Sequence, residues 1–263
     1  MNTVISKDGT PIAFDRSGEG APIILVVGAF NDRATGAPLA ATLSAHFTVF
    51  NYDRRGRGAS GDSPSYAIER EVEDLAALLD EAGGSASVFG YSSGAILALE
   101  AAARGLALSR LALYEPPFLL EDGFPKRAQE ISARLTELLS SGRRGDAVEL
   151  YQTELVGIPA EIVAQLRQAP FRPALENIAH TLVYDATILG DMPVLAQQLP
   201  YIRVPTLVIS GGNNHASMRF AAQTLADALP NAEHHSLEGQ THDIVPAVLA
   251  PVLEEFFTSS KHV

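Results

Sequence analysis

The stretch Ser87-Val88-Phe89-Gly90-Tyr91-Ser92-Ser93-Gly94-Ala95 decides the fold prediction, because a short apolar run leads into Gly-x-Ser-x-Gly and then into an alanine-rich segment. This order predicts a buried strand, a sharp turn and a helix, with Ser92 at the turn. Glycines two residues before and after the serine let the chain double back and leave its hydroxyl accessible. The helix that follows directs free N–H groups and the positive end of its dipole toward an atom reacting there. A glycine- and serine-rich turn without chemistry is the alternative, which this context disfavours.

The bulk composition is that of a globular domain. The chain has 263 residues, of which 46% are hydrophobic and 19% charged, and this excludes a disordered or fibrous chain. At this length we expect one α/β domain with an insertion in preference to two smaller domains. The formal net charge of −12 and the lack of a long basic run argue against nucleic acid and anionic membranes as partners. The short run Arg54-Arg55-Gly56-Arg57 is expected to form a solvated or salt-bridged corner.

The absence of cysteine and of long apolar segments excludes several kinds of site and of membrane association. The sequence contains no cysteine, which excludes disulfides, thiolate metal sites and cysteine nucleophiles. Residues 1–8 hold no charged region followed by an apolar stretch, and no run of about 18 apolar residues comes later. We therefore expect a soluble, cytoplasmic protein that does not associate with membranes. Its oligomeric state is open, with a homodimer among the options.

Short apolar and β-branched runs alternate with helical patterns over the first 115 residues, which is typical of strand-helix-strand units around a mainly parallel sheet. Residues 23–27 are apolar throughout, as a strand buried on both faces should be. The expected strands are 4–6, 12–15, 23–27, 47–51, 87–89 and 107–114, and the expected helices lie near 36–45, 68–82 and 93–104.

From about residue 118 to 200 the pattern contains helices only, and strand character returns at 204–209. Two apolar helix faces are expected in this segment, one with Ile131, Leu135, Leu138 and Leu139 and one with Ile162, Val163 and Leu166. A helix near 215–229, a strand near 233–237 and a helix near 246–257 complete the chain. The expected fold is therefore α/β, with a core at 1–117 and 201–263. Residues 118–200 are expected to form a helical cap over the carboxyl edge of the sheet, where open α/β sheets bind ligands.

A serine hydroxyl becomes a nucleophile when a neighbouring base takes its proton, so we look for a histidine on a late loop. His242 is the best candidate, because it follows the expected strand 233–237 and a short loop and precedes the helix that begins at Pro246. That position returns a base to the edge of the sheet where Ser92 lies. His234 and His235 lie inside the expected strand, where successive side chains point to opposite faces, so at least one of them points away from the site. We interpret both as surface or packing residues.

Two other kinds of site are weaker. A metal site of His234, His235, His242 and Asp243 is conceivable from residue type, but the helical i, i+4 spacing of typical ligands is missing. The segment Gly56-Arg57-Gly58-Ala59-Ser60-Gly61 fits a dinucleotide-binding pattern, yet Asp62-Ser63-Pro64-Ser65 follows it instead of a helix. We therefore expect neither a metal nor a dinucleotide cofactor.

Three segments together resemble the α/β-hydrolase superfamily: Gly90-Tyr91-Ser92-Ser93-Gly94 after a strand, Tyr52-Asp53-Arg54-Arg55-Gly56-Arg57-Gly58-Ala59-Ser60 after the preceding strand, and Glu238-Gly239-Gln240-Thr241-His242 near the end. The resemblance covers essentially the whole chain, cap included. It implies that Ser92 is the nucleophile and His242 the base. It also implies that residues 53–60 form a structural turn with no catalytic part.

The acid of the triad departs from the superfamily's usual pattern. The acid commonly follows the penultimate strand, where this chain has Ser210-Gly211-Gly212-Asn213-Asn214-His215 and no carboxylate. Glu115, in Leu113-Tyr114-Glu115-Pro116-Pro117, is our candidate, because it ends the strand beside that of Ser92 and can reach the far nitrogen of His242. Certain dehalogenases and the zearalenone-type lactonases are similar in taking their acid from this strand. The alternatives are an ion pair of Glu115 with an arginine, and Asp243 as the acid, which its adjacency to His242 disfavours.

Two backbone N–H groups are expected to bind an oxyanion, that of Ser93 and one from the loop after strand 23–27. This loop has Val27-Gly28-Ala29-Phe30 where many relatives have His-Gly, and backbone donors do not depend on the missing histidine. We assign Ala29, with Phe30 as the fallback. Phe30 and Tyr91 are expected to line a substrate pocket, with plain packing as the alternative.

The resemblance and these residues predict a cofactor-free serine hydrolase that cleaves a carboxylic ester or lactone through an acyl-enzyme on Ser92. The same triad can serve carbon–carbon bond hydrolysis or perhydrolysis, and a slow-turnover, receptor-like ligand-binding homologue is a further alternative. Dehalogenase and epoxide hydrolase chemistry is disfavoured, because those relatives carry a carboxylate where this chain has Ser92. The partner is a small molecule whose identity depends on the shape of the cap pocket.

Overall fold

The computed structural model describes residues 1–120 and 123–259, and an eight-stranded sheet forms its centre. The strand order is β1-β2-β4-β3-β5-β6-β7-β8. The β1/β2 and β2/β4 pairs are antiparallel, and every later pair is parallel. The strands are β1 (Asn2–Ile5), β2 (Pro11–Ser17), β3 (Ala21–Val26), β4 (Phe47–Tyr52), β5 (Ala86–Tyr91), β6 (Leu108–Tyr114), β7 (Thr206–Gly211) and β8 (Ala232–Leu237).

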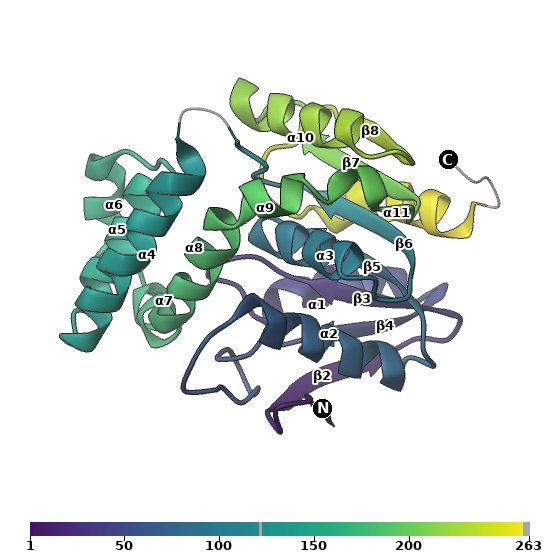
Figure 1. Ribbon diagram of the computed structural model, residues 1–263, viewed down its shortest axis with the longest axis horizontal. Helices are drawn as coiled ribbons and strands as arrows, with labels where there is room; N and C mark the ends of the chain where they lie inside the picture. The colour runs from purple at the N-terminus through teal and green to yellow at the C-terminus, as the bar shows by residue number, and fades with distance from the viewer. Residues whose placement is uncertain (121–122, 260–263) are drawn as a thin grey trace.

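Helices cover both faces of this sheet and make three layers (Figure 1). Successive residues of β3 belong to opposite faces, so Ile24 packs toward one helical layer and Ile23 and Leu25 toward the other. The helices on the Ile24 face are α2 (Ile68–Glu81), α3 (Ser93–Ala103) and α10 (Ala216–Ala228), and those on the opposite face are α1 (Arg33–Leu43) and α11 (Pro246–Thr258). The predicted α/β class with a mainly parallel sheet is confirmed.

Between β6 and β7 the described chain forms helices only, and we call this segment the helical insertion. Its elements are α4 (Phe124–Ser140), α5 (Arg144–Glu154), α6 (Ala160–Leu166), α7 (Arg172–Asn177), η1 (Ala179–Thr181), α8 (Leu182–Gly190), α9 (Met192–Ala196) and η2 (Leu199–Tyr201). Helices α4 to α7 lie to one side of the sheet in Figure 1, and α8 lies against both α4 and α3. Ile131, Leu135, Val148 and Leu182 form part of a separate apolar core here. The division into core and cap at residues 118 and 200 stays a prediction.

One apolar face of the insertion differs from the expectation. In α6 only Val163 is buried, whereas Ile162 is 41% exposed, so the predicted burial of Ile162 is wrong. The helix spans 7 residues and packs against α5, and a helix this short presents a single position to its neighbour. No helix within residues 1–120 and 123–259 is both long enough and apolar enough to cross a membrane.

The junction of β5 and α3 is packed tightly against the end of β3. A Cβ atom added to Gly94 would collide with the carbonyl oxygens of Val26 and Val27. Only a glycine lets α3 approach the neighbouring strand this closely. The close approach brings Ser93, at the start of α3, beside the loop that follows β3.

Candidate active site

Three residues with an unusual backbone meet at the carboxyl edge of the sheet. Phe30, Ser92 and Glu115 are the non-glycine residues of the described chain with positive φ, at 62°, 55° and 54°. They follow β3, β5 and β6, which are neighbours in the sheet. A left-handed backbone costs about 1–3 kcal/mol for a residue with a side chain, so it persists where the surrounding structure enforces it. Such strained positions are concentrated at functional sites, and here they mark one place in the fold.

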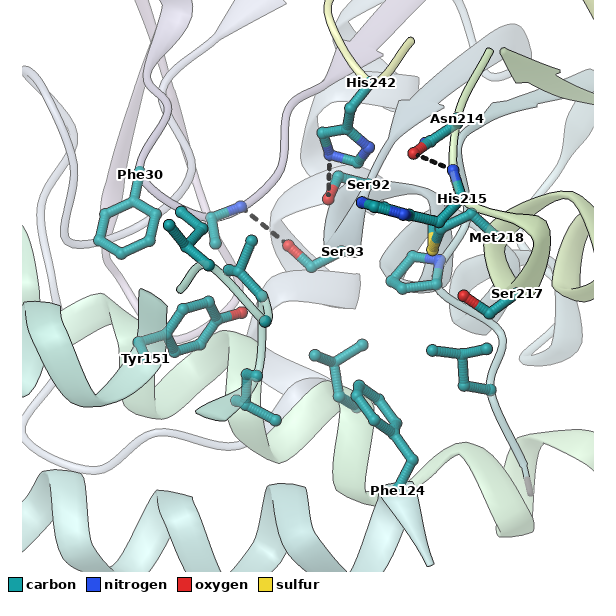
Figure 2. A pocket seen from close by; sticks show the side chains of 18 of the residues that line it. Phe30, Ser92, Ser93, Phe124, Tyr151, Asn214, His215, Ser217, Met218 and His242 are labelled. Carbon is teal, nitrogen blue, oxygen red and sulfur yellow. Dashed lines mark hydrogen bonds between the residues drawn. The ribbon is translucent and has the colours of Figure 1, made fainter. Parts of the chain in front are cut away.

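A chain of hydrogen bonds joins Ser92, His242 and Glu115. The Nε2 atom of His242 lies 3.2 Å from Ser92 Oγ, and its Nδ1 atom lies 3.2 Å from Glu115 Oε2. Figure 2 shows the first of these contacts, with the ring of His242 above the serine. Glu115 is buried, whereas the side chain of His242 is 44% exposed and faces the cavity described below. The structure thus brings together the three side chains that the sequence singled out.

The carboxylate of Glu115 is held by two further donors from the segment after β7. The Gly211 N–H donates to Oε1 at 2.5 Å, and the Asn214 side-chain amide donates to Oε2. These partners lie in the segment where the superfamily commonly carries its acid, and there Asn214 donates to the Glu115 carboxylate instead. Among the described residues Glu115 pairs with His242 and with no arginine, so the alternative ion pair is wrong; Arg219 donates to the carbonyl oxygens of Gly212 and Asn214.

Tyr114 positions the loop that carries His242, and sequence reasoning missed it. Its hydroxyl donates to the carbonyl oxygens of Thr241 and Asp243 at 2.8 and 3.0 Å, one residue on each side of His242. The side chain of Asp243, the alternative acid, is exposed to solvent.

Tyr91 packs beside the imidazole of His242, with 5.1 Å between ring centroids. Burial raises the pKa of the Tyr91 phenol, so this ring stays neutral next to the histidine.

The backbone donors differ from the predicted pair. The Ala29 N–H donates to Ser93 Oγ at 2.9 Å, so it already has an acceptor and our assignment of Ala29 needs correction. The Phe30 N–H makes no hydrogen bond with any residue in the described part of the chain. Ser93 begins α3, and the first N–H groups of a helix have no acceptor within it. The candidate oxyanion donors are therefore the N–H groups of Phe30 and Ser93.

A buried carboxylate from the helical insertion reaches the same place. Asp185 of α8 accepts hydrogen bonds from Ser93 Oγ at 2.8 Å, from Arg54 at 2.8 Å and from Arg57 at 2.7 Å. All of these charged groups are buried, and Glu71 holds the other side of Arg54. Burial alone would raise the pKa of Asp185, but Arg57 and Arg54 outweigh it and hold this pKa below its ordinary value. The carboxylate is thus ionised and ties the insertion to the start of α3.

Arg57 connects this cluster to the loop after β3. Its guanidinium donates to the carbonyl oxygens of Gly28 and Asn31, on both sides of Ala29 and Phe30. The predicted solvated or salt-bridged corner is therefore a buried, salt-bridged one, and the arginine run supports the loop that carries a candidate donor. Asp185 is the one charged residue in the mainly apolar stretch 182–189, and this was the signal by which the sequence could have shown it.

A cavity of about 500 Å³ opens in front of Ser92 and His242. Phe30 and Tyr91 line it, as predicted, together with residues of the insertion such as Tyr151, which contacts Phe30 edge to face at 5.4 Å. Figure 2 shows Phe30 and Tyr151 at one side of the cavity and His215, Ser217 and Met218 at the other. Its size is in the range of small-molecule sites.

The other histidine candidates lie away from this cavity. His234 is hydrogen-bonded to Ser210 and Gln223, and burial together with His235 lowers its pKa. Neither His234 nor His235 lines the cavity. No group of three or more His, Cys, Asp or Glu side chains within the described ranges is placed to hold a metal ion.

Comparisons with known proteins identify the family of the chain. The model of the alpha/beta hydrolase family matches residues 23–253. The chain belongs to this family. An alpha/beta hydrolase from Sphaerobacter thermophilus is similar in structure, with 55% sequence identity, a TM-score of 0.90 and coverage of 98% of this chain and 100% of that one. The enol-lactonase from Burkholderia xenovorans shares 25% identity, with a TM-score of 0.70 and coverage of 98% and 100%.

Among curated proteins, a relative from Azorhizobium caulinodans with the provisional name carbamate hydrolase RutD is 28% identical over 244 residues, which is 87% of each chain. These relatives place the chain among hydrolases. They differ in the kind of bond that their names imply, so the bond that this chain cleaves is a separate question.

The hydrogen bond between Glu115 and His242 is testable by Glu115→Gln. The amide keeps the shape of the side chain but cannot stabilise a protonated imidazole, so we expect kcat on a p-nitrophenyl ester to fall about 10³–10⁴-fold. Glu238→Gln, on the exposed loop before His242, is the control and should leave kcat unchanged. A loss smaller than about 10-fold for Glu115→Gln would show that another group orients His242.

The contact between Ser93 and Asp185 leads to a second expectation. Ser93→Ala removes the acceptor of the Ala29 N–H and a donor to Asp185, so we expect a loss of stability of about 1–3 kcal/mol. If the contact holds the donor loop in place, kcat should also fall about 10-fold with little change in KM. Ser87→Ala, at a buried serine of β5 whose hydroxyl is hydrogen-bonded to that of Ser109 on β6, is the control and should affect stability alone. An unchanged kcat for Ser93→Ala would refute the role in positioning.

Proposed function

We propose that the protein is a cofactor-free serine hydrolase that cleaves a carboxylic ester or lactone through an acyl-enzyme on Ser92. The observation that carries the proposal is the hydrogen-bonded chain from Ser92 through His242 to Glu115, with both links at 3.2 Å. Ser92 sits on the strained turn between β5 and α3, where its hydroxyl faces the cavity. This is the arrangement that activates a hydroxyl for attack on an acyl carbon.

The first half of the reaction forms the acyl-enzyme. Ser92 Oγ attacks the carbonyl carbon while His242 Nε2 takes its proton, and Glu115 stabilises the resulting imidazolium. The negative charge moves to the carbonyl oxygen, where the N–H groups of Phe30 and Ser93 bind it. His242 then gives its proton to the leaving alkoxide, and the carbon–oxygen bond breaks. In a lactone the alcohol remains attached to the acyl group.

The second half returns the free enzyme. A water molecule gives a proton to His242 and attacks the acyl carbon, and a second tetrahedral intermediate uses the same donors. The proton then moves from His242 to Ser92 Oγ as the carboxylic acid leaves. The sequence of steps needs side chains, backbone donors and water alone. The helical insertion would serve as a cap that excludes bulk water, since Tyr151 and Leu189 line the cavity from that side.

The names of the relatives support a substrate that is attacked at an acyl carbon, but they differ in which substrate this is. The names enol-lactonase and carbamate hydrolase both describe attack of a nucleophile on an acyl carbon, and the site here fits this step. Carbon–carbon hydrolysis and perhydrolysis would use the same three residues. A receptor-like homologue would hold its ligand tightly and release scarcely any product, so its turnover number would be very low.

Burst kinetics with p-nitrophenyl butyrate test the proposal. We expect one equivalent of p-nitrophenol to appear rapidly when acylation outpaces deacylation, and steady-state kcat to fall at least about 10³-fold in Ser92→Ala. Ser140→Ala, at an exposed position on α4, is the control. Undiminished hydrolysis by Ser92→Ala would overturn the proposal, and ligand binding without turnover would favour the receptor-like alternative.

A further inference from the structure

In the described part of the chain, the cavity in front of Ser92 and His242 is lined by uncharged residues and by two histidines, His215 and His242. Among the described lining residues none is Asp, Glu, Lys or Arg. Much of the described lining is apolar, and this part includes Leu119, Phe124, Leu155, Ile158, Leu189 and Met218. Polar groups gather instead at the edge formed by Asn214, His215 and Ser217, which Figure 2 shows beside Met218.

The arginines next to this lining are engaged elsewhere. Arg57 is buried, donates to two carbonyl oxygens of the loop 28–31, and forms an ion pair with Asp185. Arg219 donates to the carbonyl oxygens of Gly212 and Asn214 and does not line the cavity. A substrate carboxylate held against the apolar wall would therefore lose its hydration without gaining the bidentate or charge-assisted partner that proteins use for such groups.

We propose that this cavity selects uncharged esters whose acyl group is apolar and rejects esters with a carboxylate on the acyl chain. The inference rests on the proposed function for the reaction and on the lining for the selectivity. An apolar acyl group gains free energy in proportion to the area it buries, whereas the buried anion is penalised. The net charge of −12 also repels anions at long range, but salt screens that effect and leaves the local one.

Three substrates with one leaving group separate charge from size: p-nitrophenyl hexanoate, the p-nitrophenyl methyl diester of glutaric acid, and p-nitrophenyl hemiglutarate. We expect kcat/KM for the first two to agree within about 10-fold and to exceed the value for the hemiglutarate at least 100-fold. The ratio should persist in 0.5 M salt, because the cause is local. A hemiglutarate within 10-fold of the methyl diester, or a diester as poor as the hemiglutarate, would overturn the inference.

Binding to the Ser92→Ala protein provides a readout that does not need turnover. By calorimetry we expect the methyl diester to bind at least 10-fold more tightly than the hemiglutarate. This result would support the selectivity even if the wild-type protein hydrolysed no ester, an outcome that would refute the proposed function alone. Equal binding of the two compounds would refute the selectivity whatever the turnover.

A gain of charge gives the opposite test. Met218→Lys places an ammonium group in the lining on a side chain of similar length, and Met218→Gln is the uncharged control. We expect the lysine variant to raise kcat/KM for the hemiglutarate relative to the diester at least 5-fold, and the glutamine variant to leave this ratio as in the wild type. An equal ratio in all three proteins would contradict the inference.

Discussion

The buried carboxylate of Glu115 connects the segments on which the site depends. It lies at the end of β6 in a left-handed conformation, accepts from Gly211 and Asn214 after β7, and contacts His242 in the loop after β8. Three neighbouring strand ends are thereby fixed relative to one another. Because the Glu115 side chain is buried, losing one of these donors would leave a buried polar atom without a hydrogen-bond partner. If Glu115 is the acid, as we propose, its position at the end of β6 is accompanied by an asparagine in the segment after β7.

A second buried carboxylate, Asp185, ties the helical insertion to the reacting end of the sheet. Its bonds to Ser93, Arg54 and Arg57 link α8 to the start of α3 and to the loop after β3. Taking these charges out of water is expensive, so the cluster is weak evidence for stability and better evidence for a fixed geometry. The same insertion supplies the apolar wall of the cavity. The Asp185 cluster therefore links the placement of the candidate donors to the docking of the insertion that lines the pocket.

Much of this arrangement follows from the sequence, because the carboxyl ends of neighbouring parallel strands share one edge. Ser92, Glu115 and His242 each follow a strand that the sequence predicts, and the structure brings them within hydrogen-bond distance, while their catalytic roles stay proposals. The choice of Phe30 over Ala29 depends on the φ of one turn residue, which composition does not specify. The contact of Ser93 with Asp185 spans 92 positions along the chain, and helix patterns do not give the angle at which such segments dock.

The rate at which a neutral alkyl fluorophosphonate modifies the protein, with mass mapping of the product, tests the central claim most directly. The account predicts one phosphonyl group, on the peptide that contains Ser92. It also predicts a second-order rate constant at least 100-fold lower in Glu115→Gln and in His242→Ala than in the wild type. Modification at another residue, or a rate on Ser92 that neither substitution lowers, would contradict the account.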